Sequence, residues 1–230
     1  MWRLTTRADR GRSKSPRPRL DNPEPATRLS PPSSSIANPI DYASLKRWKT
    51  TTMLLHEFIK NPQSVGSVLS SSPQLGKRMA SYIDTAEDGW VIEFGGGTGS
   101  ITHEILQRGV LKRQLLVFEK SKIMAHKLQR RFPDLKIVSE DAARISFVRL
   151  GGLKIKAIVS SLPLRSLPQK DVLGIVKASA EMLSAGAKVI QFTYLFRSAS
   201  PWLDAGMRKV SSEIVWGNFP PAKIEVFERC

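Results

Sequence analysis

The sequence contains little of what several common classes of protein need. Among 230 residues there is one cysteine, Cys230, which excludes an internal disulfide framework, a multi-cysteine zinc site and an iron–sulfur cluster. No run of about 18 apolar residues occurs, so no transmembrane helix is expected. The three histidines, at positions 56, 103 and 126, are too scattered to predict a metal site, and we expect none.

Acidic residues are also scarce. The chain has 20 Asp and Glu against 36 Lys and Arg, a formal net charge of +16. This excess predicts an anionic partner, either a nucleic acid or an acidic membrane surface. The length and the 41% hydrophobic content fit one folded domain of ordinary size.

Residues 1–39 differ in composition from the rest. They contain seven Arg and one Lys against three acidic residues, with seven prolines and six serines. Such a segment buries too little apolar surface to offset its ordering entropy, so we predict a disordered basic arm followed by a folded domain at 40–230. No apolar core of a secretory signal follows the charges. The arm fits both a solvated tail and a segment that touches an anionic surface.

Residues 40–61 have the pattern of a basic amphipathic helix. It would begin near Asp41 and end at Asn61, before Pro62. An apolar stripe lies beside a stripe of lysines, which suits a membrane surface and equally a helix packed on its own domain. The residues expected to contact a membrane are Lys46, Trp48, Lys49, Leu55 and Lys60.

The most informative block begins at Trp90. A buried strand over 90–94 is followed by the glycine turn Gly95-Gly96-Gly97-Thr98-Gly99 and by a helix that starts at Ser100. An acidic residue, Glu93, lies in the strand end, and the turn has neither dinucleotide-binding spacing nor the Gly-Lys-Ser/Thr of a phosphate loop. This favours a ligand without phosphates whose cationic amino-acid end lies near Glu93. S-adenosylmethionine is such a ligand.

Acidic residues follow the next two predicted strands. Glu119 ends the strand at 115–119, where a carboxylate can accept hydrogen bonds from both ribose hydroxyls. Asp141 follows the strand at 135–139 and can accept from an adenine amino group. The alternatives are that Glu119 caps the helix starting near Ser121 and that Asp141 is an exposed loop acid.

The remaining pattern predicts an α/β fold. A helix capped by Ser72, with Pro73 at its first position, should run to about Asp84. Strands at 155–160 and 187–193 flank a helix at 169–183, and strands at 207–215 and 223–228 form a terminal hairpin. Alternating strands and helices predict a parallel sheet with an antiparallel hairpin at its edge, seven strands in all.

Together, Glu93–Gly99, Glu119 and Asp141-Ala142 resemble the cofactor motifs of Rossmann-like class I S-adenosylmethionine-dependent methyltransferases. Within that class the chain is similar to the bacterial phospholipid N-methyltransferases. The similarity rests on the flanking segments Phe58–Pro62, Ser71-Ser72, Ser160–Leu164, Gln191–Tyr194 and Val215–Ala222. It implies methylation of phosphatidylethanolamine towards phosphatidylcholine. It further implies a monomer, peripheral on the inner face of a bacterial cytoplasmic membrane, with no nucleic-acid partner.

The resemblance, together with the position of Tyr194 just past the fifth predicted strand, where parallel sheets of this kind place their substrate, predicts roles for particular residues. Tyr194 is the expected catalytic residue, orienting the head-group nitrogen, with a packed strand-end aromatic as the alternative. The substrate is expected to contact Ser160, Leu162, Pro163 and Tyr194. The cofactor is expected to contact Glu93, Gly95, Gly97, Thr98, Gly99, Glu119, Lys120, Asp141, Ala142 and Ser160.

Three other functions compete with this interpretation. Ribosomal RNA adenine dimethylases share the cofactor motifs, but Leu164 replaces the aromatic residue that stacks on their target base, and their C-terminal helical domain has no counterpart here. Methylation of ornithine lipids, which also carry a primary amine, is the second. A non-catalytic binding relative is the third, and the intact cofactor residues argue against it.

Overall fold

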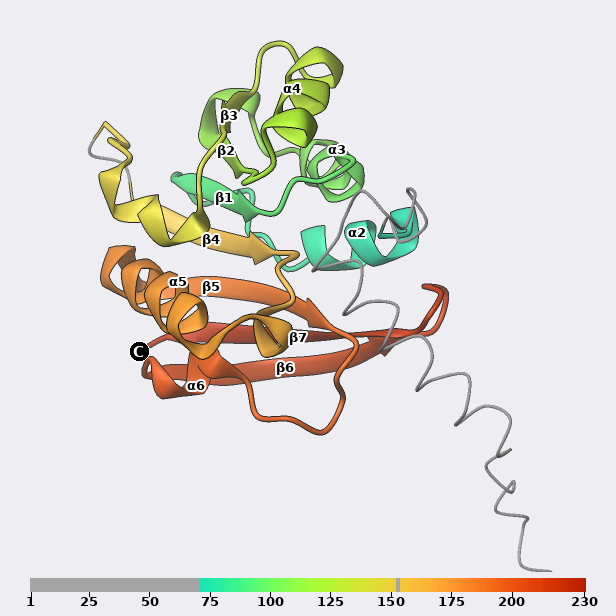
Figure 1. Cartoon of the computed structure of the whole chain (residues 1–230), viewed down its shortest axis with the longest axis vertical. Coiled ribbons are helices and arrows are strands. Elements are labelled where there is room, and N and C mark those ends of the chain that lie inside the picture. The colour runs from blue at the N-terminus through green and yellow to red at the C-terminus, as the bar shows by residue number, and fades with distance from the viewer. Residues whose placement is uncertain (1–70, 152–153) are drawn as a thin grey trace, which may run out of the picture. The chain divides into compact units, whose positions relative to one another are not determined.

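The computed structural model describes residues 71–151 and 154–230 (Figure 1). The predicted arm at 1–39 and the predicted amphipathic helix at 41–61, with its five membrane-contact residues, lie outside the described residues. Among the helices that are described, none has the length and apolarity needed to cross a membrane.

Over these residues the chain forms one seven-stranded sheet in the order β3-β2-β1-β4-β5-β7-β6. Strands β1 to β5 pair in parallel, whereas β7 is antiparallel to β5 and β6 is antiparallel to β7. The predicted α/β sheet with an antiparallel hairpin at its edge is therefore confirmed. The strands are β1 (Trp90–Phe94), β2 (Leu115–Phe118), β3 (Lys136–Val138), β4 (Ile155–Ser160), β5 (Leu183–Thr193), β6 (Met207–Val215) and β7 (Ala222–Arg229).

Helices cover both faces of the sheet (Figure 1). One core contains Leu75, Ile105 and Leu128 from α2, α3 and α4, and the other contains Ile145, Ile175 and Trp202 from η2, α5 and α6. Strands β1, β2 and β4 are buried along their whole length, because helices lie on both sides of them. The helices are α2 (Pro73–Ala80), α3 (Ser100–Gln107), α4 (Lys122–Arg131), α5 (Gln169–Met182) and α6 (Pro201–Asp204), with 3-10 turns η1 (Lys112–Gln114), η2 (Ala142–Phe147) and η3 (Leu164–Ser166).

Most predicted boundaries hold to within a residue or two, and two are wrong. The α2 helix starts as expected, since the Ser72 hydroxyl accepts a hydrogen bond from the Leu75 N–H at 3.1 Å, but it ends at Ala80 instead of near Asp84. Strand β5 begins at Leu183, four residues earlier than predicted, because Leu183 pairs with Ile155 across a register shift. Tertiary pairing, which local propensity does not report, extends that strand.

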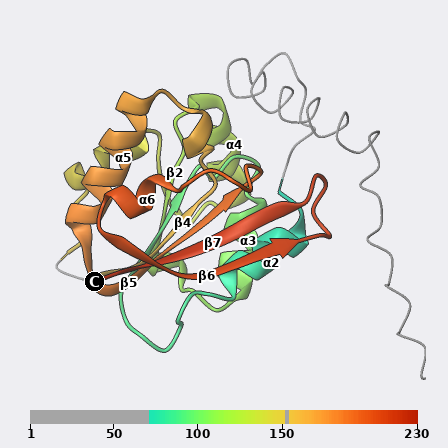
Figure 2. The ribbon, with the colours of Figure 1, turned by 90° about the horizontal axis from the view of Figure 1, so that it is seen from below.

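The carboxyl ends of β1 to β5 lie along one edge of the sheet, which we call the carboxyl edge. The β6–β7 turn, residues 216–221, lies at the same edge, because Thr193 at the end of β5 pairs with Lys223 at the start of β7 (Figure 2). In parallel sheets of this kind ligands bind outside the carboxyl ends of the strands. The predicted cofactor and substrate residues therefore share the edge where a ligand is expected.

Candidate active site

The glycine turn closes directly onto strand β2. The Gly95 and Gly96 N–H groups donate to the Phe118 carbonyl at 2.8 and 3.3 Å. Gly95, Gly97 and Gly99 have φ angles of 80°, 51° and 81°, a left-handed conformation that other residues adopt only at a cost. The turn therefore requires glycine at alternate positions for its backbone path alone.

The glycines differ in what surrounds them. A Cβ on Gly96 would lie 2.6 Å from Val117 Cγ1 and 2.7 Å from Leu128 Cδ1, and a Cβ on Gly99 would lie 2.6 Å from Phe132 Cε2. These two positions are glycine because strand β2 and helix α4 pack against them. By contrast, the nearest atom to a Cβ on Gly97 is the Gly95 carbonyl oxygen at 3.9 Å. Gly97 thus borders the open space that a ligand on this turn would need.

Glu93 is fully buried at the end of β1, and neither of its carboxylate oxygens has a hydrogen-bond partner in the described part of the chain. Burial, with a smaller contribution from the neighbouring Glu119 charge, raises the pKa of Glu93 to about 8. The Thr102 hydroxyl on α3 lies close enough to lower this pKa somewhat, although the two side chains do not meet hydrogen-bond geometry. A buried carboxyl without partners is costly unless a ligand supplies them.

Glu119 lies just beyond β2 and is held by backbone groups. Its Oε2 accepts from the Gly97 N–H at 2.9 Å and its Oε1 accepts from the Ser121 N–H at 2.8 Å. Ser121 is also the N-cap of α4. By accepting from the Ser121 N–H, Glu119 therefore helps to hold the start of that helix, which is part of the capping role that the alternative interpretation gave to Glu119. Each carboxylate oxygen keeps a lone pair for a further donor, so the ribose role stays a prediction compatible with this geometry.

Asp141 and Lys120 form an ion pair across the ends of β3 and β2, with 2.8 Å between Lys120 Nζ and Asp141 Oδ2. Asp141 also accepts from the Ala143 N–H at 2.9 Å and so starts η2. Burial raises the pKa of Asp141, but the hydrogen bonds from Lys120 and Ala143 outweigh it and leave that pKa below its usual value. Ala142, the first residue of η2, is buried in the second of the two cores. Asp141 is therefore a partly buried, ionised acceptor and is not a freely solvated loop acid.

The loop after β4 lies over the glycine turn. Ser160 is fully buried and its hydroxyl accepts from the Leu162 N–H at 3.4 Å, while the neighbouring Ser161 hydroxyl is buried with no partner among the described residues. A Cβ on Gly95 would lie 3.2 Å from Leu162 Cδ2, so loop and turn are in contact. The side-chain amide of Gln191 on β5 donates to the carbonyls of Ser160 and Leu162 at 3.2 and 2.9 Å. Pro163 then starts η3, which follows at Leu164.

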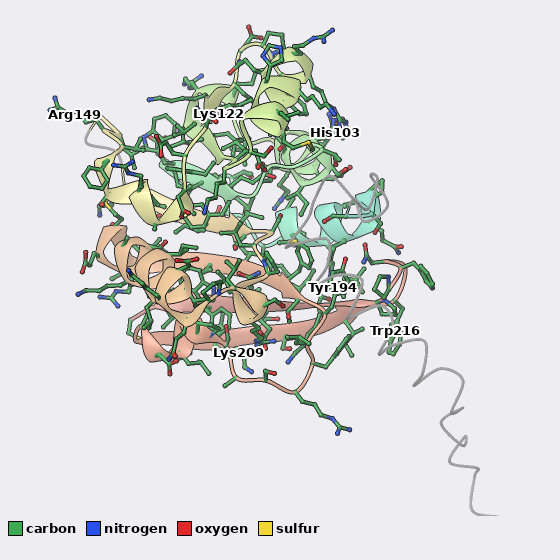
Figure 3. The ribbon with its side chains drawn as sticks, viewed as in Figure 1. His103, Lys122, Arg149, Tyr194, Lys209 and Trp216 are labelled. Carbon is green, nitrogen blue, oxygen red and sulfur yellow. The ribbon has the colours of Figure 1, made fainter. Side chains whose placement is uncertain are left out.

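Tyr194 lies directly after β5 at the carboxyl edge, with Phe192 edge-on to its ring at 5.5 Å (Figure 3). The Asn218 side-chain amide donates to its hydroxyl at 3.2 Å. The same buried side chain accepts from the Ser72 N–H at 3.0 Å and donates to the Pro220 carbonyl at 2.7 Å. Burial raises the pKa of Tyr194, so its phenol stays protonated near neutral pH. Asn218, to which sequence analysis assigned no role, thereby holds the hydroxyl of the candidate catalytic residue Tyr194 in position.

A second buried polar group holds the loop that follows Tyr194. Arg165 forms an ion pair with Glu225 at 2.6 Å, with their side chains 8% and 2% exposed. Arg165 also donates to the carbonyls of Leu195 and Ala199, at 2.5 and 3.0 Å. Sequence reasoning missed both residues, although an acidic residue flanked by apolar residues in a strand, as Glu225 is by Ile224 and Val226, is a signal of a buried pair.

These observations are compatible with the predicted S-adenosylmethionine site. The unpartnered Glu93 carboxyl and the space at Gly97 fit the cationic amino-acid end of that ligand, which carries the methyl group on a sulfonium. Glu119, Lys120 and Asp141 lie next along the same edge. Thr98 is exposed at the turn, where its carbonyl accepts from Arg131 at 2.6 Å.

Comparisons with known proteins place the chain among methyltransferases. No family model matches it. It is 27% identical over 183 residues to the ornithine lipid N-methyltransferase of Singulisphaera acidiphila, over 74% of this chain and 91% of that protein. It is also 27% identical over 181 residues to ribosomal RNA small subunit methyltransferase A of Parabacteroides distasonis, over 73% of this chain and 66% of that protein.

Among solved structures, the chain is similar to the magnesium protoporphyrin IX methyltransferase of Synechocystis with bound S-adenosylmethionine. The TM-score is 0.51 at 14% identity, over 85% of this chain and 100% of that one. The chain has the fold of a class I S-adenosylmethionine-dependent methyltransferase. The comparisons support methyl transfer as the activity of this methyltransferase and S-adenosyl-L-methionine as its cofactor, as the sequence predicted. They leave its substrate to be inferred, because the relatives named above act on different classes of molecule.

Proposed function

We propose that this methyltransferase transfers methyl groups to the amine of phosphatidylethanolamine and of its methylated products, towards phosphatidylcholine. The observation that carries the proposal is the position of Leu164, which is 3% exposed and packed in the core. In the resembling RNA adenine dimethylases an aromatic residue at this point stacks on the target base. A buried aliphatic residue offers no such surface, which favours a small amine over a base.

The groups around the candidate substrate position suit an alkylammonium ion. The Asn218 amide occupies one lone pair of the Tyr194 hydroxyl, so the other can accept an N–H of the substrate. The buried Ser161 hydroxyl also lacks a partner among the described residues and can accept another. The Tyr194 ring offers a cation–π contact that becomes more useful as methyl groups replace N–H donors.

Catalysis of this reaction depends mainly on positioning the amine in line with the methyl group. Methyl transfer is an in-line displacement in which the amine lone pair attacks the methyl carbon and the bond to sulfur breaks. The amine is protonated near neutral pH and must first lose a proton to solvent or to a nearby group. His103 and His126 are exposed on α3 and α4, so neither is proposed as this base. Tyr194 is proposed to hold the nitrogen with its lone pair directed at the methyl group.

A lipid substrate also requires contact with a membrane. We propose that the predicted helix at 41–61 supplies part of it, since each lysine near an anionic leaflet contributes about 1 kcal/mol. The protein would then act as a monomer, peripheral on the inner face of a bacterial cytoplasmic membrane. Replacing Lys46, Lys49 and Lys60 by Glu should release it from anionic vesicles, and unchanged sedimentation with vesicles would contradict this role.

The test is product analysis with methyl-labelled S-adenosylmethionine. Purified protein is incubated with vesicles of phosphatidylethanolamine and phosphatidylglycerol, with vesicles of ornithine lipid, and with a small-subunit ribosomal RNA transcript. We expect label in methylated phosphatidylethanolamine, and none with the Glu119→Ala variant. Label only in ornithine lipid, the substrate class named for the relative that is matched over 91% of its length, would correct the substrate. Label only in RNA would overturn the proposal.

A further inference from the structure

Two large aromatic side chains on the β6–β7 turn are exposed at the carboxyl edge. Trp216 is 72% exposed and Phe219 is 78% exposed, and Ile214, two residues before Trp216 on β6, is 39% exposed. Figure 3 shows Trp216 and Tyr194 at the same end of the molecule. We call Trp216 and Phe219 the aromatic tip. No role in cofactor binding or chemistry explains these exposed aromatic side chains.

The backbone beneath the aromatic tip is firmly held. Between the two aromatic residues, Asn218 is 2% exposed and points inward to its hydrogen bonds with Ser72, Pro220 and Tyr194. The Gln74 side chain at the start of α2 lies against Gly217. The backbone of the aromatic tip is therefore held in place. The Asn218 side chain also connects it to Tyr194, the residue proposed to hold the substrate nitrogen.

The charge around the aromatic tip is positive. Lys77, one turn along α2 from Gln74, is exposed, and so is Arg197 in the loop that follows Tyr194. The acidic residue nearest to Ile214 along β6, Glu213, is neutralised by Arg78 at 2.7 Å. An exposed Trp and Phe with cations beside them match the interface of an anionic bilayer, where aromatic rings lie at head-group depth and cations meet lipid phosphates.

We propose that Trp216 and Phe219 insert into the interface of an anionic phospholipid bilayer and hold the carboxyl edge against it. A lipid amine could then reach Tyr194 while its acyl chains stay in the membrane. This gain for catalysis rests on the proposed function, whereas the binding itself does not. The tip adds a contact separate from the helix predicted at 41–61, so its removal weakens binding without abolishing it.

The first test measures binding of the full chain to sucrose-loaded vesicles of phosphatidylglycerol and phosphatidylcholine, with neither cofactor nor amine lipid present. The Trp216→Ala/Phe219→Ala variant should bind about tenfold more weakly than the parent. The matched control is Phe147→Ala/Leu173→Ala, which removes side chains 75% and 55% exposed on η2 and α5 and should bind like the parent. Equal binding by the tip variant, or equal losses in both variants, would overturn the proposal.

The second test locates the tryptophan. With lipids brominated on the acyl chain, the parent's fluorescence should fall on vesicle binding, and Trp216→Phe should lose part of that quenching. If Trp216 is shielded from iodide before vesicles are added and unquenched by brominated lipid afterwards, another segment such as 41–61, or a second copy of the chain, covers the tip. That result would overturn the proposal.

Turnover separates this proposal from the proposed function. The tip variant should methylate phosphatidylethanolamine in vesicles more slowly than the parent, at equal affinity for S-adenosylmethionine, and should match it on a short-chain analogue dissolved below its micelle concentration. Equal rates on vesicles would overturn the role of the tip alone. A parent that binds vesicles through the tip but methylates no amine lipid would overturn the proposed function and leave the tip intact.

Discussion

Glu93→Gln should stabilise the ligand-free protein at alkaline pH while weakening its hold on S-adenosylmethionine. Burial raises the pKa of Glu93 to about 8 from 4.5, the value for an exposed side chain. The folded protein therefore keeps a proton that the unfolded chain loses between these two pH values. Stability falls as pH rises through that window, by about 1.4 kcal/mol per unit and on the order of 5 kcal/mol in total. Glutamine does not ionise and escapes this loss.

Urea denaturation without ligand measures the effect. Near pH 4, below the unfolded-state pKa of Glu93, the difference between parent and Glu93→Gln reflects mainly the amide, and by about pH 8 the variant should have gained several kcal/mol relative to the parent. Thr102→Val removes the neighbouring buried hydroxyl without changing charge, so its stability difference from the parent should vary far less with pH. A Glu93→Gln difference that stays constant across this range would refute the pKa argument.

Ligand binding gives an independent readout of the same group. If the cationic end of S-adenosylmethionine binds beside Glu93, the carboxyl must ionise, so close to one proton is released per ligand near pH 7. Calorimetry in two buffers with different ionisation enthalpies counts these protons. The same measurement on Glu93→Gln counts the protons exchanged by the ligand and by all groups other than Glu93. The difference between the two proteins is therefore the proton released by Glu93. Equal proton release by both proteins would show that Glu93 does not meet the cation.

Three further predictions concern the turn, the substrate side and the loop behind it. Gly97→Ala should lose about 1 kcal/mol of stability because of its left-handed backbone and should bind S-adenosylmethionine more weakly in calorimetry, and parental affinity would show that the space at Gly97 is not for ligand. Gly96→Ala should cost about 1–3 kcal/mol in denaturation because its Cβ collides with β2 and α4. Tyr194→Ala should lower turnover at unchanged cofactor affinity, with Tyr194→Phe retaining more activity if the ring dominates; normal turnover by the alanine variant would place the substrate elsewhere. Arg165→Met should cost about 3 kcal/mol in denaturation because Glu225 stays buried, and a loss under about 1 kcal/mol would mean that the remaining lysines neutralise it.

The sequence by itself determined the local structure and the class of site. Strands β1 and β4 were predicted to the residue, because buried apolar runs bounded by glycine, serine and lysine leave few alternatives. The Ser72-Pro73 start of α2 and the glycine turn after β1 were equally readable, since capping and left-handed backbone are set by neighbouring residues. These patterns led to an α/β methyltransferase fold and to S-adenosylmethionine.

Only the tertiary structure decided which residues of a motif serve the packing of the fold and which border the candidate site. The sequence treats the turn glycines alike, but packing by α4 and β2 shows that Gly96 serves the fold while Gly97 faces open space. Asn218 meets Ser72, 146 positions away, and Arg165 meets Glu225, 60 positions away. Such contacts depend on strand order and register, which the whole chain sets together. The perturbed ionisation of Glu93 arises in the same way, because burial is a property of the assembled layers and not of the motif that contains it.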